Sequence, residues 1–268
     1  MNNDLKPLIS AVSLLILGIG LFAVMRHLPI PTVPFPALTS GVVMCLLLLG
    51  LSRYFVQRDG NTLSSVNLYP NRGTFKRFVV GFTIGTCIAG SMLVALFTTT
   101  DLVLTFVNEQ SFAMFILASF IIVPLALMEE ILFRGYAFFQ MTKKLNIRIV
   151  ILLTAIAFAL YHYNENTSLY SVLLGPGIWG VVFGVAAFLS NSVAVPLGIH
   201  VAANFSQAIV GMNRYVDPMW RFDAEVLVQQ EVQQIESVGL TMQFVLLVGA
   251  ILILEYRLYK AKKYKLER

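Results

Sequence analysis

Residues 120–139 read FIIVPLALMEEILFRGYAFF, an apolar stretch that carries two adjacent carboxylates, Glu129 and Glu130. Its length matches the roughly 20 residues that a helix needs to cross a bilayer. A carboxylate at the centre of a bilayer costs about 2.5–3.5 kcal/mol, so carboxylates at this depth are rare and usually functional. Arg134 follows Glu130 by one helical turn. The stretch therefore predicts a membrane helix that contains a polar site.

The composition predicts an integral membrane protein. Charged residues make up 12% of the 268 residues, whereas soluble domains carry about 25%. Apolar runs of spanning length recur, and no segment alternates as barrel strands do, so we expect an all-α, polytopic membrane helix bundle. We expect this bundle to form a single membrane domain over residues 1–268, without a soluble domain. The predicted spans number eight: 8–25, 37–55, 78–98, 111–141, 147–163, 170–190, 193–212 and 238–256.

The loop charges predict the orientation of the bundle. Segment 53–77 holds five basic residues and one acid, the turn 142–148 holds three basic residues, and the C-terminal tail is basic. The intervening loops are acidic or neutral, so the positive-inside rule places both termini in the cytoplasm. We expect a multi-pass protein of a prokaryotic cell membrane, in contact with membrane lipid. The net charge of +5 follows from this bias and requires no nucleic-acid partner. Residues 213–237 form an external loop in which a short amphipathic helix is expected.

Two further spans carry polar residues at helical spacing. Phe158 and His162 lie four residues apart in the fifth span, and His200 and Asn204 lie four apart in the seventh. Residues at this spacing share one face of a helix. His200 and Asn204 are therefore expected to point into one cavity. The chain has only three histidines, and two of them fall inside predicted spans.

The paired carboxylates are expected to have different partners. Glu130 and Arg134 are four residues apart and can pair along their helix. Glu129 is rotated by about 100° from Glu130, which leaves it free to meet another helix. Glu129 and His162 each lie 14 residues from a basic helix end, at Lys143 and Arg148. We therefore predict that Glu129 meets His162.

These residue types suit the hydrolysis of a peptide bond inside the membrane. A carboxylate beside an imidazole can hold and deprotonate a water molecule. A second histidine and an asparagine can donate hydrogen bonds to the oxyanion that forms when water attacks an amide. An alternative that the residues leave open is a catalytic zinc with Glu129, His162 and His200 as its ligands.

The motifs resemble those of a known family. E-E-x-x-x-R at 129–134, F-x-x-x-H at 158–162 and H-x-x-x-N at 200–204 occur in the order found in the CPBP family. Its members are the CAAX proteases and bacteriocin-processing enzymes, also called Abi proteins. The resemblance covers about residues 120–210, within a motif-bearing core at about 111–212.

The resemblance implies an intramembrane endopeptidase with eight helices that acts on a peptide or a lipid-modified protein. It implies that Glu129 and His162 activate the water and that His200 and Asn204 form the oxyanion hole. The remaining motif residues, Glu130, Arg134 and Phe158, would have supporting roles. The glutamate-type mechanism that we favour needs no cofactor, while the older description of the family as zinc proteases keeps a metal as the alternative.

Two other classes of function fit a membrane protein with buried polar residues. The first is a non-catalytic immunity protein or regulator of signalling. The second is a transporter, which often has broken helices in matching halves. The sequence shows one clear break, Gly175-Pro176-Gly177, so the transporter is the weaker alternative.

Overall fold

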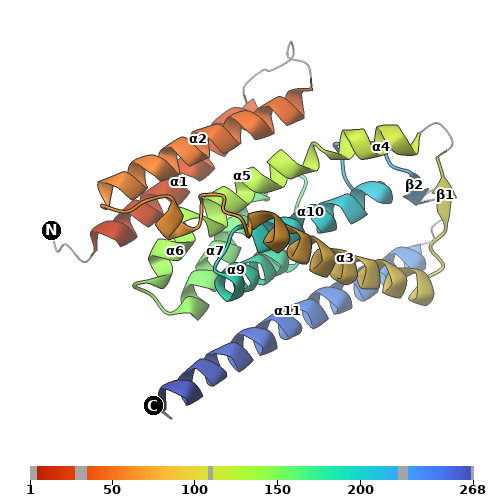
Figure 1. Cartoon of the computed structure of the whole chain (residues 1–268). Helices are drawn as coiled ribbons and strands as arrows, with labels where there is room; N and C mark the ends of the chain where they lie inside the picture. Colours follow the sequence, from red (N-terminus) through yellow and green to blue (C-terminus); the bar gives the residue numbers. More distant parts are fainter. Residues whose placement is uncertain (1–4, 28–34, 108–110, 223–228, 267–268) are drawn as a thin grey trace.

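The computed structural model describes residues 5–27, 35–107, 111–222 and 229–266. These residues form an all-α polytopic bundle with one small sheet (Figure 1), which confirms the predicted fold class. The helices are α1 (Lys6–His27), α2 (Pro36–Arg58), the 3₁₀ turn η1 (Ser64–Val66), α3 (Thr74–Thr99), α4 (Phe112–Ser119), α5 (Ile122–Arg134), α6 (Tyr136–Thr142), α7 (Ile147–Tyr161), α8 (Leu169–Val172), the π-helical turn η2 (Leu173–Gly177), α9 (Ile178–Ser190), α10 (Ala194–Ile209) and α11 (Gln229–Leu266). The strands are β1 (Leu104–Phe106) and β2 (Trp220–Phe222).

The helices match the predicted spans. Among the described residues, six helical segments are long and apolar enough to cross a membrane: Lys6–Met25, Pro36–Arg58, Thr74–Thr99, Phe112–Thr142, Leu169–Ser190 and Gln233–Lys263. The other two predicted spans are the shorter helices α7, with 15 residues, and α10, with 16. The protein therefore crosses the membrane several times.

Two of the predicted spans are interrupted. The span at 111–141 is divided into α4, α5 and α6, and the break between α5 and α6 is at Gly135. The span at 170–190 contains η2, in which the Gly175-Pro176-Gly177 sequence widens the helix by a π turn. Proline has no amide hydrogen, so Pro176 cannot donate the regular helical hydrogen bond, which accounts for the irregular turn at this position.

Helix α10 lies in the centre of the bundle, packed against α3 with the two backbones in contact. A Cβ atom at Gly81 of α3 would lie 2.1 Å from the carbonyl oxygen of Val195, and one at Gly198 of α10 would lie 2.2 Å from that of Phe78. Glycine is thus required on both helices. This contact fixes the position of α10, which carries His200 and Asn204.

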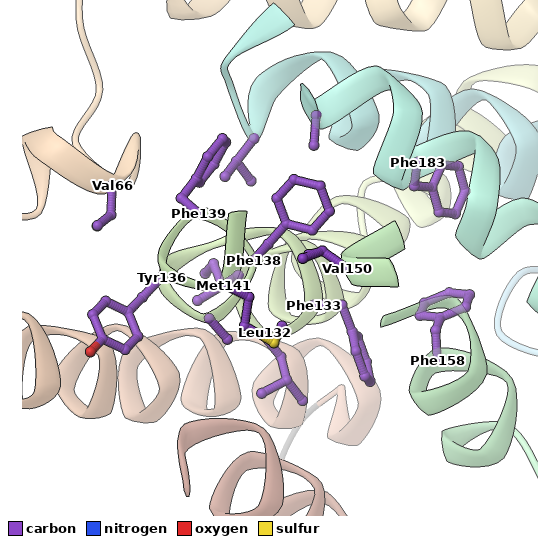
Figure 2. Close-up of a cluster of buried hydrophobic side chains, with 14 of the residues drawn as sticks. Val66, Leu132, Phe133, Tyr136, Phe138, Phe139, Met141, Val150, Phe158 and Phe183 are labelled. Atoms are coloured by element: carbon purple, nitrogen blue, oxygen red, sulfur yellow. The ribbon is translucent and has the colours of Figure 1, made fainter. Parts of the chain in front are cut away.

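Buried aromatic side chains from four helices form the core next to the predicted site (Figure 2). Phe133 of α5, Phe138 of α6, Phe158 of α7 and Phe183 of α9 are all fully buried. The Phe133 and Phe158 rings meet edge to face with centroids 5.3 Å apart. Many large apolar side chains of the outer helices are exposed instead, as at Leu252, which fits a surface covered by lipid.

The small sheet lies in the loops between spans and was not predicted. Strands β1 and β2 are antiparallel, with Thr105 opposite Arg221. The predicted external loop 213–237 therefore contains β2. Its described residues from Gln229 onward form the first turns of α11, so they continue a spanning helix and do not form a separate one. Residues 223–228 lie outside the described residues.

The bundle has two distinct ends (Figure 1). At the terminal end, where α1 begins and α11 finishes, Lys6 Nζ donates to the carbonyl oxygen of Arg58, and Arg148 forms a bidentate ion pair with Glu255. At the sheet end, which holds β1 and β2, Gln234 Nε2 donates to the carbonyl oxygen of Thr99. The basic segments gather at the terminal end, as the alternation of loop charges predicts.

Candidate active site

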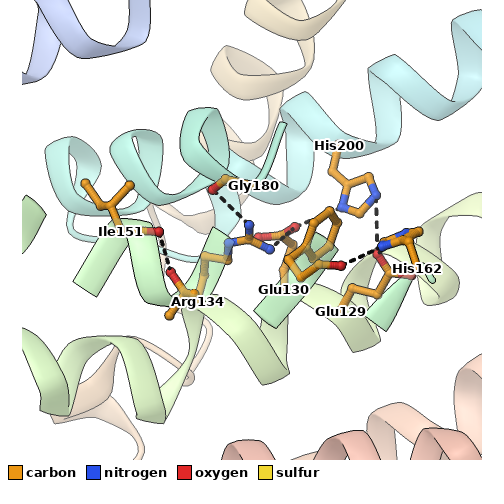
Figure 3. A network of polar contacts seen from close by, with 9 residues as sticks. Glu129, Glu130, Arg134, Ile151, His162, Gly180 and His200 are labelled. Atoms are coloured by element: carbon orange, nitrogen blue, oxygen red, sulfur yellow. Dashed lines mark hydrogen bonds and ion pairs between the residues drawn. The ribbon is translucent and has the colours of Figure 1, made fainter. Parts of the chain in front are cut away.

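The two carboxylates lie on a buried stretch of α5. Every residue of α5 from Met128 to Arg134 is buried. Glu130 and Arg134 have no exposed surface, and Glu129 is 9% exposed. Figure 3 shows these side chains converging with two imidazoles, His162 from the end of α7 and His200 from α10.

Glu130 binds two partners with one oxygen. Its Oε1 lies 2.8 Å from His200 Nδ1 and 3.5 Å from a terminal nitrogen of Arg134. The ion pair with Arg134 is the one predicted from helical spacing. The contact with His200 was not predicted, because spacing along one helix does not specify which neighbouring helix a side chain will meet.

Arg134 is held by both its charge and its flat shape. It donates to the carbonyl oxygen of Gly180 on α9 at 3.0 Å. Its guanidinium carbon lies 4.5 Å from the centroid of the Phe158 ring and 5.2 Å from that of Phe183. Such stacking on aromatic faces suits a planar cation. Arg134 therefore links α5 to α7 and α9 beneath the carboxylates.

Glu129 lies between the two imidazoles. Its Oε2 is 3.7 Å from His200 Nε2 and 3.9 Å from His162 Nε2. These distances exceed hydrogen-bond length, and this oxygen is buried with no hydrogen-bond partner among the described residues. The structure thus brings Glu129 and His162 together, as the depth comparison predicts, and adds His200 to the pair.

The backbone fixes which nitrogen of His162 faces Glu129. His162 caps the C-terminus of α7, and its Nδ1 lies 2.8 Å from the carbonyl oxygen of Phe158. A carbonyl oxygen can only accept, so Nδ1 is the donor in this contact. In the neutral ring, Nε2 then carries the lone pair, and it is Nε2 that faces Glu129. Phe158 thus positions His162 with its carbonyl and packs its ring 4.6 Å from the imidazole.

His200 and Asn204 line one cavity, as their spacing predicts. The His200 ring stacks on Phe183, with centroids 4.6 Å apart and planes 18° apart. Asn204 follows one turn later on α10. The site cavity has a volume of about 210 Å³ and is lined by Phe158, His162, Gly175, Pro176, Trp179, Phe183, His200, Ala203, Asn204, Gln207 and Gln243.

The sequence did not indicate several residues that line the cavity or contact Arg134. Phe183, Trp179 and the carbonyl group of Gly180 belong to apolar spans, in which one more apolar residue gives no signal. Gln243 does give one, because it is an isolated polar residue in the apolar run LTMQFVLLVGAILIL at 240–254. It brings α11 into the wall of the site cavity.

The predicted zinc ligands do not form a ready metal site. Within the described ranges, no cluster of three His, Cys, Asp or Glu side chains is arranged to hold a metal ion. Glu129, His162 and His200 are close to one another, and each imidazole contacts a protein oxygen through Nδ1 while its Nε2 faces Glu129. Metal-bound histidines commonly have such an Nδ1 contact, so these contacts do not decide between the two mechanisms. Zinc binding stays a prediction.

Comparison with known proteins identifies the segment that carries the site. The family model of the Rce1-like proteins, described as type II CAAX prenyl endopeptidases, matches residues 109–206. No curated protein and no solved structure matches the chain. The matched segment contains all three motifs and every residue of the Glu–His cluster. The match supports the predicted resemblance: residues 109–206, which carry the three motifs, are similar to the CAAX protease family.

Proposed function

We propose that this protein is an intramembrane endopeptidase in which Glu129 and His162 activate the attacking water. The observation that carries the proposal is the position of Glu129 Oε2, buried between the Nε2 atoms of His162 and His200. The family match supports a protease, and the buried cluster supplies the groups that hydrolysis needs.

The water is held by two acceptors. It donates one hydrogen bond to Glu129 Oε2 and the other to His162 Nε2, whose lone pair is available because Nδ1 donates to the carbonyl group of Phe158. The lone pairs of the water oxygen are then free to face a peptide carbonyl in the site cavity. This arrangement orients the nucleophile before any proton moves.

Hydrolysis then follows a balanced sequence. The water oxygen forms a bond to the carbonyl carbon while one of its protons moves to Glu129, which gives a tetrahedral oxyanion. Glu129 passes that proton to the amide nitrogen, the carbon–nitrogen bond breaks, and the products are an amine and a carboxylic acid. One carboxylate thus acts first as a base and then as an acid.

His200 and Asn204 stabilise the oxyanion. Asn204 donates from its side-chain amide and His200 from Nε2, and each donor of this kind is worth about 10²–10³ in rate. His200 Nδ1 already donates to Glu130, so the ring must carry both protons.

The substrate is a peptide or a lipid-modified protein, in keeping with the prenyl endopeptidases that the family model describes. The protein works in a prokaryotic cell membrane with both termini in the cytoplasm, as the basic loops of the terminal end favour.

The test is cleavage of a fluorogenic peptide library, with and without a prenylated cysteine, by the purified protein in proteoliposomes. We expect at least one peptide to be cleaved, and Glu129→Gln to lower the rate by about 10²–10⁴. Glu165→Gln, an exposed carboxylate in the loop after His162, is the matched control and should keep full activity. Cleavage that persists in Glu129→Gln would rule out the proposed base. A cellular phenotype that survives the same substitution would favour the non-catalytic regulator.

A further inference from the structure

A groove leads from the site cavity to the sheet end of the bundle. This approach groove has a volume of about 530 Å³, and its lining at the far end includes Leu96, Ser168, Met212 and Glu236. It runs between α3, α10 and α11 and shares five lining residues with the site cavity: Gly175, Trp179, Ala203, Gln207 and Gln243. The two hollows therefore adjoin each other along these residues.

Two glutamines mark the junction of the approach groove and the site cavity. Gln207 comes from α10 and Gln243 from α11. The side-chain oxygen of Gln243 is buried and has no hydrogen-bond partner among the described residues. A primary amide both donates and accepts, so it complements the N–H and C=O groups of a peptide backbone. A buried polar atom of this kind is normally satisfied, and a bound peptide would satisfy it.

The rest of the groove also suits a peptide. Three serines, Ser168, Ser171 and Ser206, lie among its apolar side chains. A neighbouring hollow between α3, α9 and α11 has a volume of about 600 Å³ and is lined almost entirely by apolar residues such as Ile84, Val185 and Ile253. Hydrocarbon chains suit that second hollow. The approach groove, with its amides and hydroxyls, matches a polymer that has polar groups along its whole length.

The far end of the groove lies on one side of the membrane. Leu96 is one turn before the end of α3, Ser168 precedes α8, and Met212 follows α10. The loops after α3, before α8 and after α10 are acidic or neutral, and the positive-inside rule predicts that such loops lie outside the cytoplasm. Gln234 of α11, two residues before Glu236, donates a hydrogen bond to the carbonyl oxygen of Thr99 at this same end.

We infer that the substrate is an extended peptide segment that reaches the active site from the non-cytoplasmic face, along the approach groove. Gln207 and Gln243 hold its backbone where the groove meets the site cavity. The inference rests on the proposed function for the identity of the substrate, but the accessibility of the groove can be measured without any cleavage.

Accessibility is tested with single cysteines in a Cys45→Ala, Cys87→Ala background, which removes both native thiols. Ser206→Cys and Ser171→Cys place a thiol in the approach groove with little change of size. Ser65→Cys, exposed in η1 at the terminal end, and Ser91→Cys, in the apolar hollow, are the matched controls. Each variant is treated with a membrane-impermeant maleimide, first in intact cells and then after permeabilisation.

We expect the groove cysteines to be labelled in intact cells, the Ser65→Cys variant only after permeabilisation, and the Ser91→Cys variant poorly in both. Groove labelling that requires permeabilisation would overturn the inference by placing access in the cytoplasm. Groove cysteines that never react would overturn it by showing that the groove is closed to water. Both results are independent of Glu129→Gln, so failure of the access route is distinguishable from failure of the proposed chemistry.

The role of Gln243 is tested with the peptide that the library assay identifies. Gln243→Leu keeps the size of the side chain but removes its hydrogen bonds, each worth about 0.5–1.5 kcal/mol net. We expect KM to rise about tenfold with kcat little changed, which corresponds to about 1.4 kcal/mol of lost binding. Thr241→Val on the same helix is the matched control, since Thr241 is exposed. An unchanged KM for Gln243→Leu would exclude the proposed contact.

Discussion

His200 Nδ1 lies 2.8 Å from Glu130 Oε1, and both side chains are buried in the middle of the bundle. The same oxygen pairs with Arg134, which in turn donates to the carbonyl oxygen of Gly180. A continuous chain of polar contacts therefore joins α10, α5 and α9. The adjacent carboxylate, Glu129, is outside this chain and faces the imidazole Nε2 atoms. The two glutamates have thus different surroundings, and their substitution should have different consequences.

Glu130→Gln should destabilise the protein much more than Glu129→Gln. Removing the charge of Glu130 leaves Arg134 buried without its counter-ion, and breaking a buried pair typically costs about 3–5 kcal/mol. Glu129 has no cation fixed at hydrogen-bond distance, so its amide variant should unfold within about 1 kcal/mol of the parent. Thermal unfolding in mild detergent measures both. Equal stability of the two variants would contradict the assignment of Glu130 to Arg134 and His200.

Arg134→Lys should also be destabilising, although it conserves the charge. A lysine ammonium cannot lie flat against Phe158 and Phe183 while it donates to the carbonyl oxygen of Gly180. Buried cation–aromatic contacts are worth about 2 kcal/mol, so we expect a loss of about that size in the unfolding free energy. Arg134→Met, which leaves Glu130 uncompensated, should lose more. If Arg134→Lys unfolds like the parent protein, the planar contacts have no energetic importance.

The sequence was sufficient for those features that depend on one helix at a time. Each predicted span is helical, although two of them are interrupted, and the Glu130–Arg134 pair follows from a spacing of four residues. The meeting of Glu129 and His162 could also be predicted. A short turn joins their helices, so two residues equally far from that turn lie at the same depth in the membrane.

Features that depend on how distant helices pack could not be predicted. Counting residues from the predicted cytoplasmic end of each helix puts His200 shallower than Glu129, yet the two side chains meet. The turn before α10 is itself buried at Ser192 and Val193, so this helix begins inside the bundle and the count underestimates its depth. The stacking of Phe183 on His200 was hidden for another reason, since an apolar residue in an apolar span is the ordinary case.

Gly81→Val should separate α10 from α3 and impair the site without touching it. A Cβ atom at this position would meet the carbonyl oxygen of Val195 at 2.1 Å, a backbone atom that has no room to move. Overpacking of this kind typically costs about 1–3 kcal/mol, and the shift of His200 and Asn204 should lower cleavage as well. Gly90→Val is the control on the same helix, because a Cβ atom there has no neighbour within 4 Å. Both variants carry the same β-branched residue, so a difference between them reports the helix contact. Equal stability and activity would show that α3 does not position α10.

Chelators should leave the peptidase active. In the proposed mechanism Glu129 and His162 activate the water directly, so no step needs a metal ion. We expect activity to survive dialysis against 1,10-phenanthroline, and the zinc content, measured by mass spectrometry, to be well below one ion per chain. His162→Ala separates the two descriptions further. It should abolish cleavage under both, but only for a zinc enzyme would it also lower the metal content, because a ligand is lost. Activity that disappears with the chelator and returns with added zinc would replace the glutamate-type mechanism by a metal-bound water held by Glu129, His162 and His200.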